Sequence, residues 1–310
     1  MRQVALFPGQ GSQYVGMGLD LFTNFEKAKE MYKLADSILG FSISDISFNG
    51  PLETLKETRY TQPALFVHSA ILFELIKDKL EIAATAGHSV GEYAALFAAG
   101  VINFEDGLKI VAKRGDLMFQ SGIKQPGTMY AVIGLEDEKV EDVCRQCTEN
   151  GNGQVVVAAN YNSPGQLVIS GSKELLANCV SKFKESGAKM VKELVVSGAF
   201  HSPLMQSSAD ELAKIINSTN FQSANVPVYL NVTSKPETDA KIIKQALIEQ
   251  LTSPVLWSQS MQNMSNDGFK TFIEVGAGNV LQGLAKRTLG DAVINGVDKV
   301  DSLYELVKIS

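Results

Sequence analysis

Cysteine, histidine and long apolar runs are all scarce in this 310-residue chain. Its three cysteines are odd in number and too few for a disulfide framework, which suits a reducing cytoplasm. The longest apolar-leaning stretch, residues 64–76, is interrupted by polar side chains, so no segment is expected to span a membrane. The N-terminus lacks a small-residue cleavage site, so we expect no secretory signal.

An excess of basic charge is also absent. The formal net charge is -6 at pH 7, with 28 Lys and Arg residues against 34 Asp and Glu residues. This balance argues against nucleic-acid binding and is compatible only with a local basic patch. The fractions of hydrophobic (45%) and charged (20%) residues are typical of a globular protein. The length of 310 residues allows one large domain, or one domain that carries a smaller insert.

The most informative motif is Gly-His-Ser-Val-Gly at residues 87–91. A short apolar run at residues 81–86 predicts a strand before it, and an Ala/Leu-rich run at 92–99 predicts a helix after it. A serine between glycines at a strand-to-helix turn is typical of a nucleophile elbow. The unpaired N–H groups at the start of such a helix can stabilise an oxyanion. Ser89 is therefore the predicted nucleophile.

Alternating strand and helix patterns predict an α/β fold with a large α/β-hydrolase-like domain built on a parallel sheet. The strands expected in that sheet are residues 4–7, 81–86, 226–230 and 270–275. The helices expected around it are residues 24–39, 60–79, 92–99, 104–119, 241–251, 261–266 and 280–287.

A different order of elements occupies the middle of the chain. Residues 128–196 follow the order β-α-β-β-α-β, which is typical of a ferredoxin-like motif. We therefore predict a small ferredoxin-like domain at residues 125–197, inserted into a large domain formed by residues 1–124 and 198–310.

Only three histidines are available as the general base that a serine nucleophile needs. His68 lies in an apolar helical pattern, which favours a place in the core or on a helix surface. His88 directly precedes the serine, so we expect it to pack beside the elbow. His201 follows the predicted insert in a loop between a strand and a helix, where catalytic residues commonly lie, and is the predicted base. No acidic residue stands out as the third member, and a carbonyl group can orient the ring instead.

Arg114 lies on the helix expected after the elbow helix. A guanidinium binds a carboxylate through two parallel hydrogen bonds. Such a clamp rejects neutral acyl groups, because the buried cation would then lack its partner. A surface ion pair with Asp116 or Glu105 is the alternative.

Two other motifs resemble metal or cofactor sites but are incomplete. Cys144 and Cys147 have C-x-x-C spacing without a second pair or a matching histidine, so we expect two surface-proximal thiols and no metal. The loop at residues 9–14 has Tyr14 where a dinucleotide fingerprint requires glycine, so we expect no bound cofactor.

Five motifs occur in order along the chain, at residues 7–13, 87–92, 114–115, 198–202 and 274–278. Together they resemble the bacterial malonyl-CoA:acyl carrier protein transacylases of fatty acid synthesis, over residues 3–289. The resemblance implies that malonyl-CoA is the substrate, that a malonyl-serine ester is the intermediate and that acyl carrier protein is a transient partner. We expect a cytoplasmic monomer.

The resemblance also assigns roles to matching positions. Ser89 matches the nucleophile and His201 the base. The backbone N–H groups of Gln10 and Val90 match the oxyanion hole, although leucine is common at the second position. The main-chain carbonyl of Gln250 matches the group that orients the histidine, which would account for the missing acid.

Three further positions concern the substrate. Arg114 matches the arginine that binds the free carboxylate of malonate. Phe200 resembles the residue of malonyl-selective members that crowds the α-methyl position of methylmalonyl groups. Asn160 falls where the family has a substrate-side asparagine.

Because the chain is itself acidic, docking of an acidic carrier protein requires a local basic patch. The candidates are Lys286 with Arg287, and Lys189 with Lys192, and an ordinary solvated surface is the alternative for both pairs.

Other functions stay open. A free-standing malonyl transferase of a polyketide pathway would share the chemistry and nearly all motifs. The missing acid argues against an α/β serine hydrolase, and so does Arg114 if it lies in the site. A non-catalytic, carrier-binding scaffold would not require both Ser89 and His201.

Overall fold

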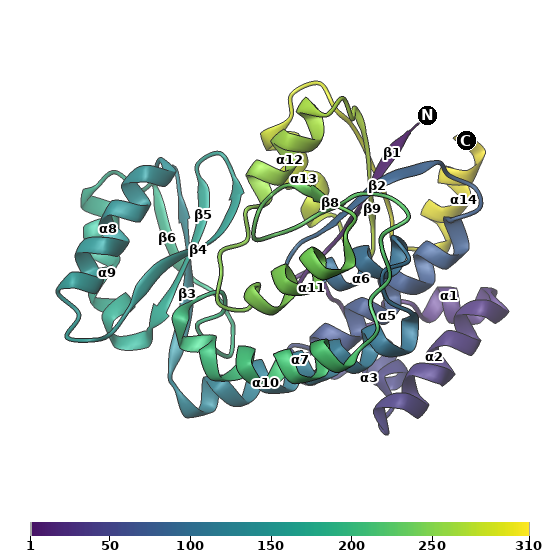
Figure 1. Ribbon diagram of the computed structural model, residues 1–310, viewed down its shortest axis with the longest axis horizontal. Coiled ribbons are helices and arrows are strands. Elements are labelled where there is room, and N and C mark those ends of the chain that lie inside the picture. Colours follow the sequence, from purple (N-terminus) through teal and green to yellow (C-terminus); the bar gives the residue numbers. More distant parts are fainter. Residues whose placement is uncertain (1, 310) are drawn as a thin grey trace.

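The computed structural model describes residues 2–309, and the side chains of residues 2–306. Within this range a six-stranded sheet has the order β10-β9-β1-β2-β7-β8 (Figure 1). Its strands are β1 (Gln3–Phe7), β2 (Ile82–Gly87), β7 (Val228–Tyr229), β8 (Pro236–Glu237), β9 (Thr271–Val275) and β10 (Val293–Val297). All neighbours pair in parallel except β7 and β8. The expected parallel sheet is confirmed, and β8 and β10 go beyond the strands expected from the sequence.

Helices bury this sheet on both faces, as a parallel sheet requires. Along β1, Val4 and Leu6 pack with helices α12 (Trp257–Asn266) and α13 (Val280–Thr288). Ala5 and Phe7 face the opposite way, toward α5 (Thr58–Ile76) and α6 (Gly91–Ala98). The strand therefore consists almost entirely of apolar residues instead of alternating with polar ones.

The remaining helices of this part surround that core. They are α1 (Leu19–Asn24), α2 (Glu26–Leu39), α3 (Ile43–Asn49), α4 (Leu52–Leu55), α7 (Phe104–Lys124), α10 (Gln206–Ser218), α11 (Ala240–Glu249) and α14 (Val300–Ile309), with a short 3-10 turn at Pro203–Met205. No helix within residues 2–309 has the length and apolar character needed to cross a membrane.

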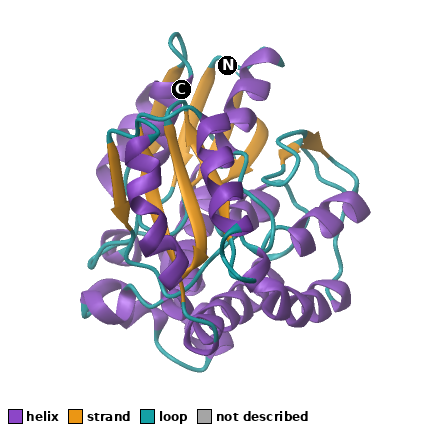
Figure 2. Ribbon diagram, turned by 90° about the vertical axis from the view of Figure 1, so that its left-hand side faces the viewer, coloured by secondary structure: helices purple, strands orange, loops and turns teal. Residues whose placement is uncertain are grey.

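A second sheet, drawn at the left of Figure 1, is antiparallel and has the order β4-β5-β3-β6. Its strands are β3 (Gly127–Ile133), β4 (Val156–Ser163), β5 (Gln166–Ser172) and β6 (Met190–Glu193). Helices α8 (Asp137–Glu149) and α9 (Lys173–Glu185) cover its outer face, which is turned toward the viewer in Figure 2. The chain order and strand order are those of a ferredoxin-like motif. The domain boundaries at residues 125 and 197 stay a prediction.

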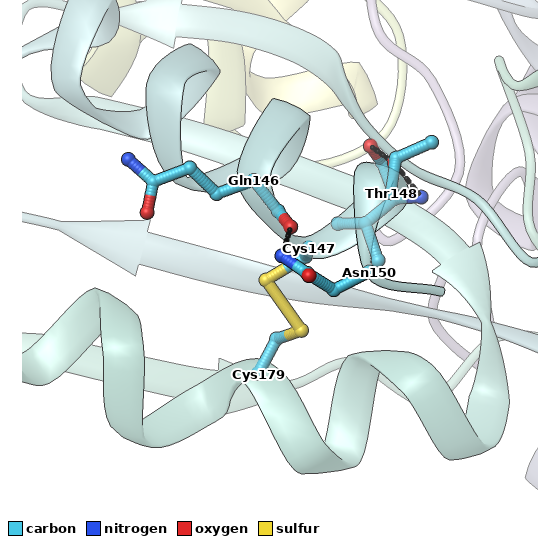
Figure 3. Close-up of a disulfide and its surroundings, with 6 residues drawn as sticks. Gln146, Cys147, Thr148, Asn150 and Cys179 are labelled. Atoms are coloured by element: carbon cyan, nitrogen blue, oxygen red, sulfur yellow. Dashed lines mark hydrogen bonds between the residues drawn. A yellow bond between two sulfur atoms is a disulfide. The ribbon is translucent and has the colours of Figure 1, made fainter. Parts of the chain in front are cut away.

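The cysteines of the small sheet differ from the expectation. Cys144, Cys147 and Cys179 are all buried between the sheet and its two helices. Cys144 and Cys147 lie on the apolar stripe of α8, which also includes Val140 and Val143, so helical periodicity places them inside. The expectation of surface-proximal thiols is therefore wrong. Figure 3 shows a disulfide that joins Cys147 on α8 to Cys179 on α9, with the two Cα atoms 6.4 Å apart.

Candidate active site

The nucleophile elbow is present where the sequence predicts it. Strand β2 ends at Gly87 and helix α6 begins at Gly91, with Ser89 between them at a φ of 53°. A Cβ on Gly87 would lie 2.0 Å from the carbonyl of Gly91, and a Cβ on Gly91 would lie 2.1 Å from the carbonyl oxygen of Phe7. Only glycine fits at both positions, and this tight packing forces the turn that presents Ser89.

Ser89 and His201 form a hydrogen-bonded pair. The distance from Ser89 Oγ to His201 Nε2 is 2.7 Å. His201 Nδ1 lies 2.9 Å from the carbonyl oxygen of Gln250 and 3.2 Å from that of Ser253. Because a carbonyl only accepts hydrogen bonds, Nδ1 carries the proton and Nε2 is free to accept one from Ser89. The carbonyl of Ser253 is a partner that the sequence analysis does not find.

His201 is electrically neutral at neutral pH. Its burial, and next the positive charge of Arg114, lower the pKa of His201 to about 3. A neutral imidazole is the form that can remove a proton from a serine hydroxyl. The environment therefore favours the basic form of His201.

Arg114 is completely buried beside this pair. Its Nη1 donates to Gln62 Oε1 at 2.8 Å, and its Nη2 donates to Gln250 Oε1 at 3.0 Å and to Ser89 Oγ at 3.1 Å. Burial lowers the pKa of Arg114 from its usual value. The hydrogen-bond partners of the guanidinium are thus neutral, while the buried carboxylate of Glu92 favours its charged form without bonding to it.

The alternative surface ion pair for Arg114 does not form. Within residues 2–309, Glu105 lies 3.8 Å from Lys109, and no carboxylate lies within ion-pair distance of Arg114. The ring of Tyr93 lies 5.6 Å from the guanidinium carbon. The cation therefore belongs to the interior of the site.

Two backbone N–H groups near Ser89 are free to bind an oxyanion. Those of Gln10, in the loop after β1, and Val90, just before α6, have no acceptor in the described part of the chain. The N–H of Ser89 itself is occupied, because it donates to Asn231 Oδ1 at 2.7 Å. Val90 and Gln10 thus supply free donors on two sides of the nucleophile, as the family resemblance predicts.

A cavity of about 190 Å³ opens at Ser89 and His201. Asn160 and Phe200, both expected to contact substrate, line it and are nearly buried. The opposite wall combines the apolar Met129, Val168 and Leu194, the last just after β6, with polar residues of the small sheet such as Gln166. The two sheets together therefore enclose the space in front of the nucleophile.

The other two histidines occupy the places expected from the sequence. His68 is fully buried on α5, and its Nε2 lies 2.9 Å from Asp298 Oδ1. His88 packs beside the elbow, with its Nε2 2.8 Å from Asn162 Oδ1 and its ring 5.5 Å from that of Trp257. Neither imidazole makes a hydrogen bond to Ser89 Oγ within the described residues, so His201 is the base candidate that the geometry supports.

The candidate docking residues differ in their distance from the cavity. Arg287 donates to Gln166, which lines the cavity. Lys192 lies directly opposite Ala131 in the small sheet, in the same row as the cavity-lining Val168. Lys189 and Lys286 are exposed, and no side-chain contact among residues 2–306 links them to the cavity.

Three residues that hold the site are not found by the sequence analysis. They are Gln62, which binds Arg114, and the pair Glu92 and Asn231, which adjoin the elbow. Asn231 follows the short strand β7, the neighbour of β2 in the sheet. A polar residue just after a buried parallel strand is the signal that points to it.

Known proteins share this architecture. The acyl transferase domain family matches residues 4–303. The malonyl CoA-acyl carrier protein transacylase of Haemophilus influenzae is 42% identical over 306 residues, 97% of each protein. A crystal structure of an acyl carrier protein S-malonyltransferase from Vibrio cholerae superposes with a TM-score of 0.94 at 41% identity, covering 99% of this chain and 100% of the other. A malonyl-transacylase in complex with a type II polyketide acyl carrier protein superposes with a TM-score of 0.94 at 36% identity, over 100% of both chains.

Proposed function

We propose that this chain, which belongs to the acyl transferase family, transfers malonyl groups from malonyl-CoA to acyl carrier protein. The acceptor is the phosphopantetheine thiol of the carrier protein, and the reaction supplies fatty acid synthesis. One observation carries the assignment. Ser89 Oγ lies 2.7 Å from the base His201 and 3.1 Å from the buried cation Arg114. A nucleophile with a fixed positive charge at hydrogen-bond distance suits an acyl group that itself ends in a carboxylate.

The first half-reaction acylates the enzyme. Ser89 Oγ attacks the thioester carbonyl of malonyl-CoA while its proton moves to His201 Nε2. The N–H groups of Gln10 and Val90 stabilise the resulting oxyanion. When the tetrahedral intermediate collapses, the carbon–sulfur bond breaks, and His201 returns the proton to the departing CoA thiol.

The second half-reaction reverses these roles. The thiol of the carrier protein loses its proton to His201, and its sulfur attacks the malonyl ester. Ser89 then leaves as the alcohol and regains the proton from His201. Both halves use the same groups, which is the pattern of a ping-pong transfer.

Arg114 couples substrate choice to the base. Its charge is one of the causes that lower the pKa of His201. A malonyl carboxylate bound to Arg114 offsets that charge, so substrate binding shifts the pKa of His201 back toward its usual value and strengthens the base. An acetyl group would leave the buried cation unpaired.

The partner and setting extend this proposal. We propose that the carrier protein docks on basic residues at the cavity edge, with Arg287 the best placed. Because one chain supplies the whole site, a monomer is sufficient, and thioester-to-thiol transfer needs proton transfer but no bound cofactor. The cytoplasm stays a prediction from composition.

A second candidate pathway is favoured by one comparison. The similar malonyl-transacylase found with a polyketide carrier protein supports the same chemistry with a different acceptor. Transfer assays with one carrier protein from each pathway, at equal concentration, discriminate between them.

Labelled malonyl-CoA tests the proposed reaction. We expect a burst of one malonyl ester per chain that persists until carrier protein is added and then moves to the carrier. Ser89→Ala, with an unchanged thermal unfolding midpoint, should take up no label. Continuous release of free malonate would instead indicate a hydrolase, and the absence of any ester on the wild type would indicate a scaffold.

A further inference from the structure

Asn231 braces the nucleophile elbow with both ends of its side-chain amide. It is 1% exposed and lies at the end of β7, next to the end of β2. Its Oδ1 accepts from the N–H of Ser89 at 2.7 Å, and its Nδ2 donates to the carbonyl of Gly87 at 2.6 Å. A single amide group therefore spans the turn, binding the residue before His88 and the residue after it.

Asn231 is itself held from two sides. Its backbone N–H donates to Glu92 Oε2 at 2.8 Å, and its carbonyl accepts from the N–H of Leu256 at 2.9 Å. Glu92 is fully buried in the first turn of α6, the helix that follows the elbow. The hydrogen bonds thus link the end of β2, the nucleophile and the start of α6 through one asparagine.

This arrangement matters because the backbone of Ser89 is unfavourable on its own. At a φ of 53°, Ser89 is in the left-handed region, where its Cβ lies too close to the following carbonyl oxygen. The conformation persists only where the surroundings impose it. Asn231 also occupies the N–H of Ser89 and so leaves the oxyanion to Val90 and Gln10. Asn231 is not one of the residues that line the cavity.

We infer that Asn231 is a positioning residue that holds Ser89 with its Oγ directed at His201, and that Glu92 keeps Asn231 in place. The inference rests on the proposed acyl transfer through Ser89. It assigns no proton transfer to either residue. Their contribution is the geometry of the nucleophile, and a displacement of 1 Å there can cost about 100-fold in rate.

The experiment measures the malonyl burst in Asn231→Leu, which keeps a similar volume but loses every side-chain hydrogen bond. We expect the acylation rate constant per active chain to fall about 10- to 100-fold, with little change in KM and a burst amplitude that still approaches one per chain. The matched control is Asn263→Leu. Asn263, on α12, donates to Ser234 in the loop that also contains Asn231, but it does not contact the elbow. Asn263→Leu should therefore keep the wild-type rate constant.

Conservative variants separate positioning from folding. Asn231→Asp keeps the acceptor for Ser89 but loses the donor to Gly87, and should have an intermediate rate constant. Glu92→Ala should lower the rate constant as Asn231→Leu does. Glu92→Gln, which still offers an oxygen to the N–H of Asn231, should recover most of that loss.

The outcomes decide between the alternatives. A lower burst amplitude and unfolding midpoint, with an unchanged rate constant in the remaining active chains, would mean that Asn231 serves only the fold and would overturn the inference. Should Asn231→Leu not fold, equal rate constants for Glu92→Ala and Glu92→Gln would overturn it as well. Failure of the proposed function would look different, since the wild type itself would then form no ester or would release free malonate continuously.

Discussion

The two walls of the cavity are built on different principles. On the large-sheet side, Ser89, His201, Arg114 and Gln250 are connected by hydrogen bonds of 2.7–3.1 Å. On the small-sheet side, apolar side chains such as Val168 line the cavity together with the uncharged amides of Asn160 and Gln166, and no charged side chain of the described residues takes part. The first wall holds the buried cation and the hydrogen-bonded Ser89–His201 pair, and the second is uncharged and limits the shape of the cavity. We therefore expect acyl transfer to depend on residues of the first wall, and selectivity for the size of the acyl group to depend on residues of the second.

The difference follows from the sheets themselves. In a parallel sheet the carboxyl ends of neighbouring strands meet at one edge, so loops after β1, β2 and β7 bring polar groups together there. In the small antiparallel sheet, α8 and α9 cover one face, and the other face is left to pack toward the large domain. Polar groups collect at strand ends, and apolar groups collect on the covered faces.

The largest effect should come from removing the base on the polar wall. His201→Ala is expected to slow acylation by malonyl-CoA about 10²- to 10⁴-fold, the usual contribution of a general base. Single-turnover labelling measures the rate. Leu194→Ala, which shortens an apolar side chain on the small-sheet side of the cavity, is the matched control and should change the rate less than about tenfold. If both variants lost the same fraction of the acylation rate, the reaction would not depend on the first wall more than on the second.

The second effect concerns the buried cation. Arg114→Ala should lose most malonyl transfer while its relative activity toward acetyl-CoA rises, because no unpaired charge then opposes a neutral acyl group. Competition between the two labelled thioesters measures the ratio. Arg114→Lys keeps the charge without the two-pronged geometry and should lie between wild type and alanine. An unchanged ratio in Arg114→Ala would contradict the carboxylate clamp.

How much of this site is predictable depends on whether its signal is local. The elbow is encoded in five adjacent residues, and His201 is found by elimination among three histidines. Helix α10 is not among the helices expected from the sequence. Its pattern is nevertheless helical, because Ala209, Leu212 and Ile216 recur at helical spacing on its buried side.

The rest of the site depends on contacts between distant segments. Gln62 meets Arg114 across 52 residues, and Asn231 meets Ser89 across 142. The same holds for Cys147 and Cys179, which are 32 residues apart. The position of Asn231 after a buried strand marks it as a candidate site residue, but the local pattern does not identify the partner in any of these pairs. The partners meet only through the tertiary arrangement of strands and helices.

A third, smaller effect should appear where the two walls meet. Phe200 is 5% exposed, directly precedes His201 and lines the cavity. Phe200→Ser should relax discrimination against methylmalonyl-CoA by about tenfold, since one methyl group in a pocket is worth about 1–3 kcal/mol. The measurement is the ratio of kcat/KM for the two thioesters. Unchanged discrimination would remove the role assigned to the ring.

The smallest effect is expected outside both walls, at the cavity edge. Arg287 reaches Gln166 from α13 and so bridges the large domain to the small sheet, with the exposed Lys286 beside it. Replacing both residues by glutamate should weaken transfer to an acidic carrier protein about three- to tenfold, mainly by slowing association. The loss should be greater at low salt, because ions screen exposed charges over about 8 Å at physiological ionic strength. Lys189→Glu with Lys192→Glu is the parallel pair on the small sheet. The double variant of Lys286 and Arg287 could instead slow both half-reactions equally at every salt concentration. In that case the contact between Arg287 and Gln166 supports the fold, and the basic charges do not guide the carrier protein.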